Sequence, residues 1–172
     1  MMYSVSAISV LLTITSTFLY VYRDVIMAKS FAITFGTISY HFLMRLAVGF
    51  AFDIFMKNQA DYSLKWYQCR PWEVKLYRWL KVKQWKSKLP TYDPGHFDPK
   101  QHTWSEIIQA MCQAELVHEV IVVLSFVPIV LSHWFDDLLV FVITSLCAAL
   151  FDTIFVILQR YNRPRIIRFS NR

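Results

Sequence analysis

The chain alternates between four long apolar runs and polar connecting segments. The runs cover residues 5–22, 31–56, 120–135 and 138–158, and charged residues are rare inside them. A transmembrane helix needs about 20 apolar residues to cross a hydrocarbon core of about 30 Å, because an α-helix rises about 1.5 Å per residue. Each run reaches or approaches this length, and 120–135 is the short one. The pattern predicts an all-α, polytopic membrane protein with four transmembrane helices and a single membrane domain over residues 1–172.

The positive charge lies almost entirely on one side of that topology. Four spans place the N-terminus, the segment 57–119 and the C-terminal tail on the same side of the membrane. The only basic residues expected on the other side are Arg23 and Lys29, and the turn at Asp136 and Asp137 on that side is acidic. Because basic residues mark the cytoplasmic side, we expect both termini and segment 57–119 to be cytoplasmic. The basic residues on that side are Lys57, Lys65, Arg70, Lys75, Arg78, Lys81, Lys83, Lys86, Lys88, Lys100, Arg160, Arg163, Arg165, Arg168 and Arg172.

The composition argues against several classes of protein. Hydrophobic residues make up 56% of the chain, which leaves too little polar surface for a soluble globule. The first run has no basic leading region and no small-residue cleavage site, so we interpret it as a helix and not as a secretory signal. Topology and anionic lipid account for the net charge of +6, so we expect no nucleic-acid partner. Cys69, Cys112 and Cys147 are separated and predict no disulfide.

Segment 57–119 begins with a predicted interfacial element. Over residues 71–83 the apolar positions Trp72, Leu76, Trp79 and Leu80 recur at helical spacing. This predicts a basic amphipathic helix that lies in the membrane interface, with tryptophans at headgroup depth. The alternative is a small cytosolic helix packed on its neighbours. The prolines and the glycine of residues 89–99 predict a loop over the membrane face.

A further helix is predicted to start at Thr103, where Thr103 and Glu106 have the spacing of a capping box. Nothing in the sequence breaks this helix before Pro128. On its apolar stripe, Glu115 and His118 lie one turn apart. A carboxylate and an imidazole are costly to bury there unless they pair or take part in chemistry.

The Glu115 and His118 pair has three interpretations. A carboxylate fixes the tautomer of a histidine, and imidazole ordinarily titrates near pH ~6.5, so the pair suits a general base. A purely structural polar pair is the alternative. Metal binding of the ferritin-like type needs two Glu-x-x-His copies and two further glutamates, and this chain has one copy, so we expect no metal. We interpret Cys112, one turn before Glu115, as an inert buried cysteine and not as an acyl-carrying nucleophile.

Two further groups of polar residues lie in or beside the spans. Arg45 and Asp152 are at depths that allow them to meet if the second and fourth spans are neighbours, either as a structural pair or as the lining of a polar cavity for substrate. Residues 159–165 form a dense group of donors at the expected end of the last helix. Guanidinium groups bind phosphate or carboxylate through paired hydrogen bonds, so this group predicts an anion site or, alternatively, an anchor on lipid headgroups.

Five motifs follow one another in the last two thirds of the chain: Trp72-Glu73, Leu76-Tyr77, residues 83–90, residues 114–118 and residues 159–165. In their order and spacing they resemble those of the glycosyl-diaponeurosporenoate acyltransferase family of the staphyloxanthin-type carotenoid pathway. The resemblance implies a small protein of a bacterial cell membrane that esterifies a hydroxyl of a glycosylated isoprenoid, or of another glycolipid, with a fatty acyl group.

These motifs lead to a mechanistic hypothesis of direct acyl transfer at the cytoplasmic face. His118, oriented by Glu115, would deprotonate the acceptor hydroxyl as it attacks an acyl thioester. No bound cofactor is expected, and the donor is acyl-CoA or an acyl carrier protein. Residues 72–90, including Trp85, would form the surface through which lipids reach the site. The side chains expected to hold the phosphates of the donor or the oxyanion are Arg160, Asn162, Arg163, Lys86 and Lys88.

A second hypothesis belongs to a different class of protein. A non-enzymatic membrane module that binds or transports lipid, or that scaffolds a pathway complex, also explains the basic face and the buried charges. A lipid reductase or methyltransferase is disfavoured, because the chain has only three glycines and no glycine-rich phosphate loop. Membrane lipid is the expected partner under each hypothesis. Formation of a homo-oligomer through the serine- and threonine-rich first span is also open.

Overall fold

The computed structural model describes residues 2–89, 95–135 and 137–170, and its regular elements are helices. Four helical stretches are long and apolar enough to cross a membrane: Met2–Arg23, Met27–Phe55, Trp104–Trp134 and Leu138–Ser170. The predicted all-α fold with four candidate transmembrane helices is therefore confirmed. The predicted acidic turn falls partly on residue 136, and the predicted loop falls partly on residues 90–94, which lie outside the described residues.

The chain forms two compact units. The first contains residues up to 50 together with 120–151, and the second contains residues 51–119 together with the chain from 152 onward. Three helices, α2 (Met27–Phe55), α5 (Trp104–Leu124) and α7 (Leu138–Ser170), continue from one unit into the other. The prediction of a single membrane domain stays a prediction.

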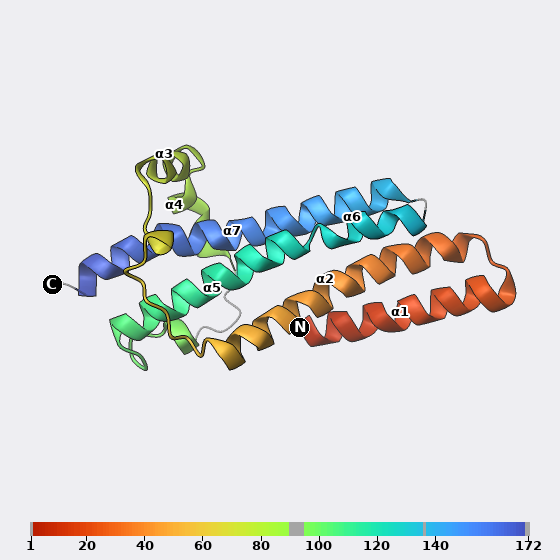
Figure 1. The fold of residues 1–172 in the computed structure, drawn as a ribbon, viewed down its shortest axis with the longest axis horizontal. Helices are drawn as coiled ribbons and strands as arrows, with labels where there is room; N and C mark the ends of the chain where they lie inside the picture. Colours follow the sequence, from red (N-terminus) through yellow and green to blue (C-terminus); the bar gives the residue numbers. More distant parts are fainter. Residues whose placement is uncertain (1, 90–94, 136, 171–172) are drawn as a thin grey trace. The chain divides into compact units, whose positions relative to one another are not determined.

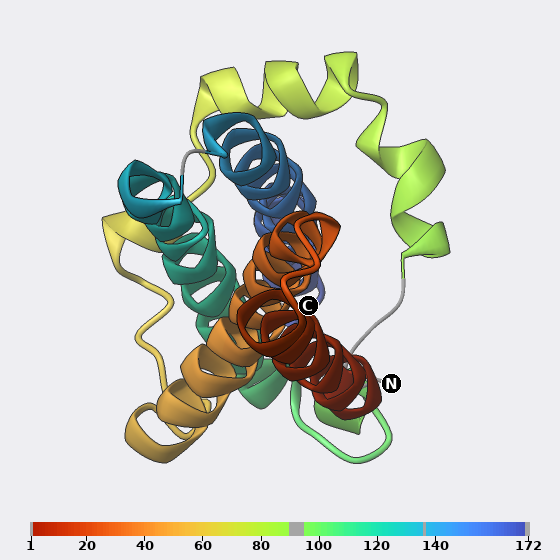
Figure 2. The ribbon, with the colours of Figure 1, turned by 90° about the vertical axis from the view of Figure 1, so that its right-hand side faces the viewer.

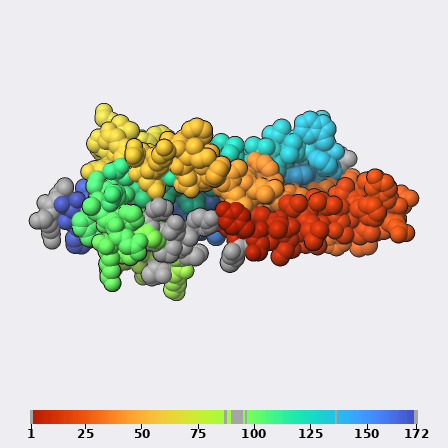
Figure 3. Space-filling view, turned by 90° about the horizontal axis from the view of Figure 1, so that it is seen from below, coloured from red at the N-terminus to blue at the C-terminus, as the bar shows by residue number. Residues whose placement is uncertain are grey.

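In the first unit, α1 (Met2–Arg23) runs beside α2 (Figures 1 and 3). The small polar residues of α1 recur on one face, where Ser6, Ser9 and Ser16 are buried. On this face Thr13 Oγ1 lies 3.3 Å from Ser39 Oγ of α2. Small residues let helices approach closely. Because this face contacts α2 within the chain, a homo-oligomer would need another surface of α1, such as its exposed apolar one. That oligomer stays a prediction.

The third apolar run is interrupted earlier than predicted. Helix α5 ends at Leu124, and a new helix, α6 (Val127–Leu131), contains Pro128 in its first turn. Proline has no N–H, so the carbonyl of Leu124, four residues before it, loses its helical donor. Tyr40 of α2 supplies a replacement, since its hydroxyl donates to the Leu124 carbonyl oxygen at 2.9 Å.

Helix α7 continues well past the predicted end of the fourth span. It reaches Ser170 and includes Pro164, whereas the apolar run stops at Leu158. At about 1.5 Å per residue the extension is longer than three helical turns. The arginine-rich residues 159–165, predicted to lie at a helix C-terminus, therefore lie along the side of a continuing helix.

The second unit carries the short helices α3 (Pro71–Trp79) and α4 (Val82–Trp85), which form a curved band in Figure 2. The predicted helix over residues 71–83 is thus two helices, separated where Lys81 adopts a left-handed conformation (φ 52°). Helix α3 buries Glu73 and Tyr77, and leaves Trp72 57% exposed and Trp79 77% exposed. The predicted interfacial face therefore points away from the unit, as membrane contact requires, although that contact stays a prediction.

The start of α5 agrees with the sequence. The backbone N–H of Thr103 donates to Glu106 Oε2 at 2.7 Å, and the backbone N–H of Glu106 donates to Thr103 Oγ1 at 3.3 Å. This reciprocal pair is the predicted capping box, and it fixes the first turn of the helix that carries Glu115 and His118.

Candidate active site

One group of buried charges in the second unit surrounds Glu115 of α5. This carboxylate is fully buried and accepts hydrogen bonds from two arginines of α7, from Arg160 Nη1 at 2.5 Å and from Arg163 Nη1. Arg163 is 1% exposed, so this ion pair is shielded from solvent. Buried pairs of this kind are stable only when their remaining hydrogen-bonding groups are also satisfied.

The other N–H groups of Arg160 and Arg163 hold the backbone that precedes α3. They donate to the carbonyl oxygens of three consecutive residues. Arg160 donates to those of Trp66 at 3.0 Å and Gln68 at 3.3 Å, and Arg163 donates to that of Tyr67. Arg163 also lies over the ring of Tyr67, 5.2 Å from its centroid. The two arginines therefore tie the short 3₁₀ helix Lys65–Tyr67 and the residue after it to α7.

Glu73 of α3 completes this arrangement, which we call the arginine clamp (Glu73, Glu115, Arg160 and Arg163). Its Oε1 accepts from Arg160 Nε at 3.0 Å, and its Oε2 accepts from the backbone N–H of Arg70 at 2.6 Å. Two guanidiniums thus face two carboxylates. Burial, and secondarily the negative charge of Glu73, raise the pKa of Tyr77 to about 12, which keeps that phenol neutral beside the clamp.

The clamp changes the predicted roles of Arg160 and Arg163. We predicted that they hold the phosphates of the acyl donor or the oxyanion. Their N–H groups instead donate to protein carboxylates, to backbone carbonyls and, from Arg163, to Cys112 Sγ at 3.6 Å. Guanidiniums saturated in this way have little capacity left for a ligand, so we revise their role to holding α3 and the segment before it on α7.

His118 has a different carboxylate partner from the predicted one. Its Nδ1 lies 2.9 Å from Oδ1 of Asp152 on α7, and its ring stacks on Phe155 with the ring centroids 4.8 Å apart. The side chain of Asp152 is 1% exposed, whereas that of His118 is 24% exposed. Among the residues that the structure describes, no hydrogen bond is made to His118 Nε2. The imidazole is thus partly accessible, and its Nε2 is the nitrogen that does not contact the carboxylate.

The prediction that Glu115 orients His118 is therefore wrong. Both oxygens of Glu115 are engaged by the arginine clamp, and Asp152 takes the place next to the imidazole. Glu115 and His118 share one face of α5, as predicted, but α7 supplies a separate partner to each of them. The geometry of a general base is preserved with Asp152 as the orienting acid.

A third group of side chains surrounds Tyr161 of α7. Lys86 Nζ donates to Asn162 Oδ1 at 2.7 Å and lies 5.2 Å from the centroid of the Tyr161 ring. The guanidinium of Arg165 lies 3.8 Å from the same centroid and donates to the Tyr161 hydroxyl. Burial, together with the positive charges of Arg165 and Lys83, lowers the pKa of Lys86. We call Lys83, Lys86, Asn162, Tyr161 and Arg165 the cationic cluster.

Trp85 and Lys88 flank this cluster in the sequence. The indole N–H of Trp85 donates to the Leu80 carbonyl oxygen at 2.9 Å, which joins the end of α3 to α4. Lys88 is exposed at the end of the following 3₁₀ turn, Lys86–Lys88. Their predicted contacts with substrate stay predictions.

Arg45 belongs to the first unit and is described there. It donates to the carbonyl oxygen of His41, one turn earlier in α2, at 2.9 Å and to that of Ala148 in α7 at 3.4 Å. Its predicted pairing with Asp152 would join the two units and stays a prediction.

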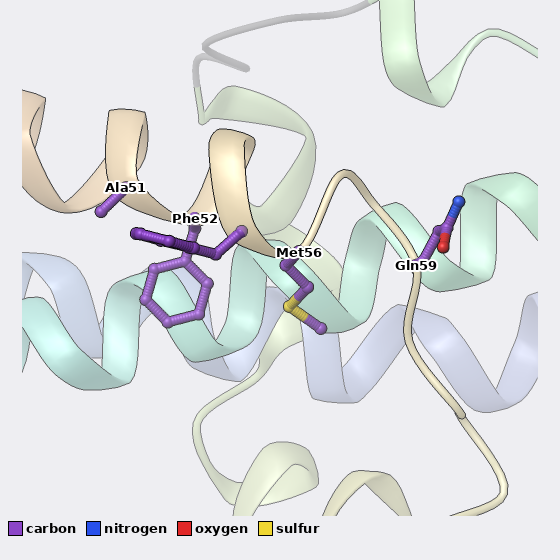
Figure 4. A pocket seen from close by; sticks show the side chains of 5 residues that line it. Ala51, Phe52, Met56 and Gln59 are labelled. Carbon is purple, nitrogen blue, oxygen red and sulfur yellow. The ribbon is translucent and has the colours of Figure 1, made fainter.

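Two hollows lie at the end of α2. One, of about 440 Å³, is lined by Ala51, Phe52, Phe55, Met56 and Gln59 (Figure 4). The other, of about 340 Å³, is lined by Lys57, Asn58, Gln59, His102, Glu106, Gln109 and Ala110. Neither is lined by His118 or Asp152, so we base the candidate site on the side-chain arrangement and not on these hollows. Within residues 2–89, 95–135 and 137–170, no group of three or more His, Cys, Asp or Glu side chains could hold a metal ion.

Sequence reasoning missed the roles of Glu73 and Tyr161. Glu73 was noted only as part of a motif, although an acidic residue next to a tryptophan on a short amphipathic helix was a usable signal for an ion pair. Tyr161 stands among the donors of residues 159–165, and its spacing of four residues from Arg165 on a helix predicts their contact.

Comparison with known proteins relates this arrangement to one family. Residues 63–172 match the family described as glycosyl-4,4'-diaponeurosporenoate acyltransferase. That range contains the arginine clamp, the His118 and Asp152 pair and the cationic cluster, and it does not contain Arg45. No curated protein and no solved structure matches the chain. Since the match covers more than half of the chain, this multi-pass membrane protein belongs to the glycosyl-4,4'-diaponeurosporenoate acyltransferase family of carotenoid biosynthesis.

Proposed function

We propose that this protein transfers a fatty acyl group from a thioester to a hydroxyl of a glycosylated isoprenoid, or of a related glycolipid, at the cytoplasmic face of a bacterial cell membrane. Its membership of an acyltransferase family supports the type of reaction. The observation that carries the proposal is the 2.9 Å contact between His118 Nδ1 and the buried Asp152 carboxylate.

This contact suits the imidazole to act as a base. A carboxylate at Nδ1 holds the proton on that nitrogen and leaves the lone pair of Nε2 available. It also stabilises the imidazolium that forms when Nε2 takes a proton. The stacking of His118 on Phe155 fixes the plane of the ring, so that Nε2 has a defined direction. The imidazole is therefore preorganised before substrate binds.

The reaction that follows from this geometry has two proton transfers. His118 Nε2 removes the proton of the acceptor hydroxyl while its oxygen attacks the thioester carbonyl carbon. The tetrahedral intermediate collapses by cleavage of the carbon–sulfur bond, and the departing thiolate takes the proton from the imidazolium. The products are an ester and a free thiol, and His118 returns to its neutral form. No oxidant, metal or further reactant is consumed.

Two features support the cytoplasmic face as the place of reaction. Basic residues concentrate in segment 57–119 and in the C-terminal part of the chain, as they do on cytoplasmic sides of membrane proteins. Trp72 and Trp79 of α3 expose apolar surface beside basic residues, which suits an interfacial position from which a lipid-like acceptor can approach.

Purified protein incubated with a labelled acyl-CoA and a lipid extract tests the proposal. We expect labelled ester from the wild type and none from His118→Ala. His133→Ala is the matched control, because His133 is an exposed histidine of the first unit, and it should retain activity. A folded His118→Ala variant with full activity would exclude the base assignment.

The same experiment distinguishes the enzyme from a lipid-binding or scaffold module. Saturable binding of the extracted lipid without transfer of label, over a range of thioester donors, would favour the module. Identifying the labelled product by mass would also establish which hydroxyl-bearing lipid accepts the acyl group.

A further inference from the structure

The cationic cluster differs from the arginine clamp in its balance of charge. The clamp pairs two guanidiniums with two carboxylates. In the cationic cluster, Lys86 and Arg165 both lie over the Tyr161 ring, and the charge of Lys83 acts on Lys86. In the described part of the chain none of these three cations forms an ion pair with a carboxylate. Burial is the main cause of the lowered pKa of Lys86, and repulsion by the charges of Arg165 and Lys83 lowers it further.

The cluster is nevertheless well ordered by neutral contacts. Asn162 Oδ1 accepts from Lys86 Nζ at 2.7 Å, and the centroid of the Tyr161 ring is 5.2 Å from Lys86 Nζ and 3.8 Å from the Arg165 guanidinium. Lys86 and Tyr161 are half-buried, while Arg165 is exposed. Within the described residues, Lys86 donates to Asn162 and Arg165 to Tyr161, and their other N–H groups have no hydrogen-bond partner there and can bind an anion that approaches from solvent. Lysine and arginine side chains bind phosphate esters through charge-assisted hydrogen bonds.

We propose that the cationic cluster binds the phosphate of a phosphopantetheine thioester, which presents its acyl group to His118. This inference deepens the proposed function and rests on it. It names the class of acyl donor, and it assigns Lys86, Asn162 and Arg165 to the carrier end of that donor.

The spacing along α7 selects this class of donor. Asn162 follows Asp152 by ten residues, which places the cluster about 15 Å along the helix axis from the residue that orients His118. A phosphate bound there must be joined to the reacting carbonyl by a long linker. The pantetheine arm is such a linker, whereas in an acyl phosphate the phosphate adjoins the carbonyl and could not occupy both places.

Donor truncation tests the proposal. Wild-type protein should use acyl-CoA and acyl-phosphopantetheine with similar KM values, and acyl-pantetheine, which lacks the phosphate, with a KM about ten-fold higher, as expected for the loss of one charge-assisted contact. Lys86→Gln with Arg165→Gln should raise KM for the first two donors about ten-fold and leave KM for acyl-pantetheine unchanged. Lys100→Gln, an exposed lysine outside the cluster, is the matched control and should change none of these values.

Binding of free coenzyme A to the purified protein gives a readout that does not depend on activity. The double variant should bind it about ten-fold more weakly than the wild type and the control. If transfer is absent but this difference is found, the proposed function fails while the phosphate site stands. If transfer occurs and wild type uses acyl-pantetheine as well as acyl-phosphopantetheine, the phosphate site is excluded.

A lipid headgroup offers the same phosphate chemistry, and membrane composition separates the two sources. The assays are repeated in nanodiscs of phosphatidylcholine alone and in nanodiscs that contain phosphatidylglycerol. The proposal expects the effect of the double variant in both. The proposal would be overturned if the double variant had an effect only in nanodiscs with phosphatidylglycerol and the wild type used acyl-phosphopantetheine and acyl-pantetheine with the same KM. This result would identify a site for a lipid headgroup.

Discussion

The imidazole of His118 is oriented by Asp152, 34 residues away in the chain, and not by Glu115 one turn away on the same helix. The 2.9 Å contact joins α5 to α7, and the arginine clamp joins the same two helices through Glu115. Two carboxylates of opposite helices therefore have separate roles. In the proposed mechanism Asp152 prepares His118 for proton transfer, while Glu115 pairs with the two arginines of α7 and so joins α5 to that helix.

Asp152→Asn should slow acyl transfer without changing the binding of the donor. The amide keeps the size of the side chain but lacks the charge that stabilises the imidazolium. We expect kcat to fall by about 10²–10⁴, the usual contribution of general acid–base catalysis, with KM for the donor nearly unchanged.

Asp152→Glu serves as the conservative variant for that measurement, because it restores the carboxylate and should recover part of the activity. If both variants had wild-type kcat, or if the loss appeared only in KM, the assignment of Asp152 as the orienting acid would be wrong.

Glu115→Gln should destabilise the protein strongly. Arg160 keeps its pairing with Glu73, but the buried Arg163 loses the carboxylate of Glu115. Breaking a buried ion pair costs about 3–5 kcal/mol. Chemical unfolding in a mild detergent measures the free energy of unfolding.

The matched control for Glu115 is Glu119→Gln on the next turn of α5. Glu119 accepts a hydrogen bond from the Trp66 indole at 3.0 Å, which a glutamine oxygen can also accept. We expect a change of about 0.5 kcal/mol or less for this surface-type substitution. Equal stability of the two variants would argue against the clamp as the main support of α3.

Donor binding should weaken at alkaline pH because of Lys86. Its folded-state pKa is lowered, by burial first and then by Arg165 and Lys83, so the ammonium loses its proton below its ordinary value of 10.5. The attraction for phosphate is complete below the lowered pKa and is lost as pH rises through it. KM for acyl-CoA should therefore rise as pH passes through the lowered pKa, and so below pH 10.5.

Lys86→Arg tests this interpretation, since a guanidinium stays protonated throughout this range. The variant should keep a low KM to higher pH than the wild type. Identical KM profiles for the two proteins would assign the alkaline change to another group.

Tyr40→Phe should weaken the packing of α2 on the broken third span. The substitution removes the donor to the Leu124 carbonyl, and an unsatisfied buried acceptor costs about 1–3 kcal/mol. In a Pro128→Ala background the backbone N–H of residue 128 can reach this carbonyl, so the same substitution should cost less. Unfolding of the four proteins of this double-mutant cycle gives the coupling, and strict additivity would show that Tyr40 does not compensate for Pro128.

The outer face of α3 should contact the membrane interface. Trp72 and Trp79 are 57% and 77% exposed, and lipids brominated near the headgroup should quench them in reconstituted protein. The double substitution to phenylalanine should remove most of this quenching, whereas Trp85→Phe, a half-buried control, should remove little. Unchanged quenching in the double variant would favour a cytosolic position for α3.

Local patterns in the sequence predicted the helices and much of their chemistry. Residues of one helix have a fixed spacing, so the capping box of Thr103 and Glu106 and the shared face of Glu115 and His118 could be inferred directly. Hydrophobic length similarly predicted four spans. The apolar run that ends at Leu158 did not predict the extension of α7 to Ser170, because polar residues outside the membrane also form helix when a neighbour packs against them.

The sequence by itself therefore determined that the chain is an all-α membrane protein, that a carboxylate and an imidazole lie on one helix face, and that cations gather near residues 83–88 and 159–165. Only the tertiary structure decided which charges meet. It paired Glu115 with Arg160 and Arg163, His118 with Asp152, and Lys86 with Asn162. The physical reason is that a buried charge is stabilised by the nearest complementary group in space, and packing of α5, α7 and the segment before α3 brings together residues that are far apart in the chain.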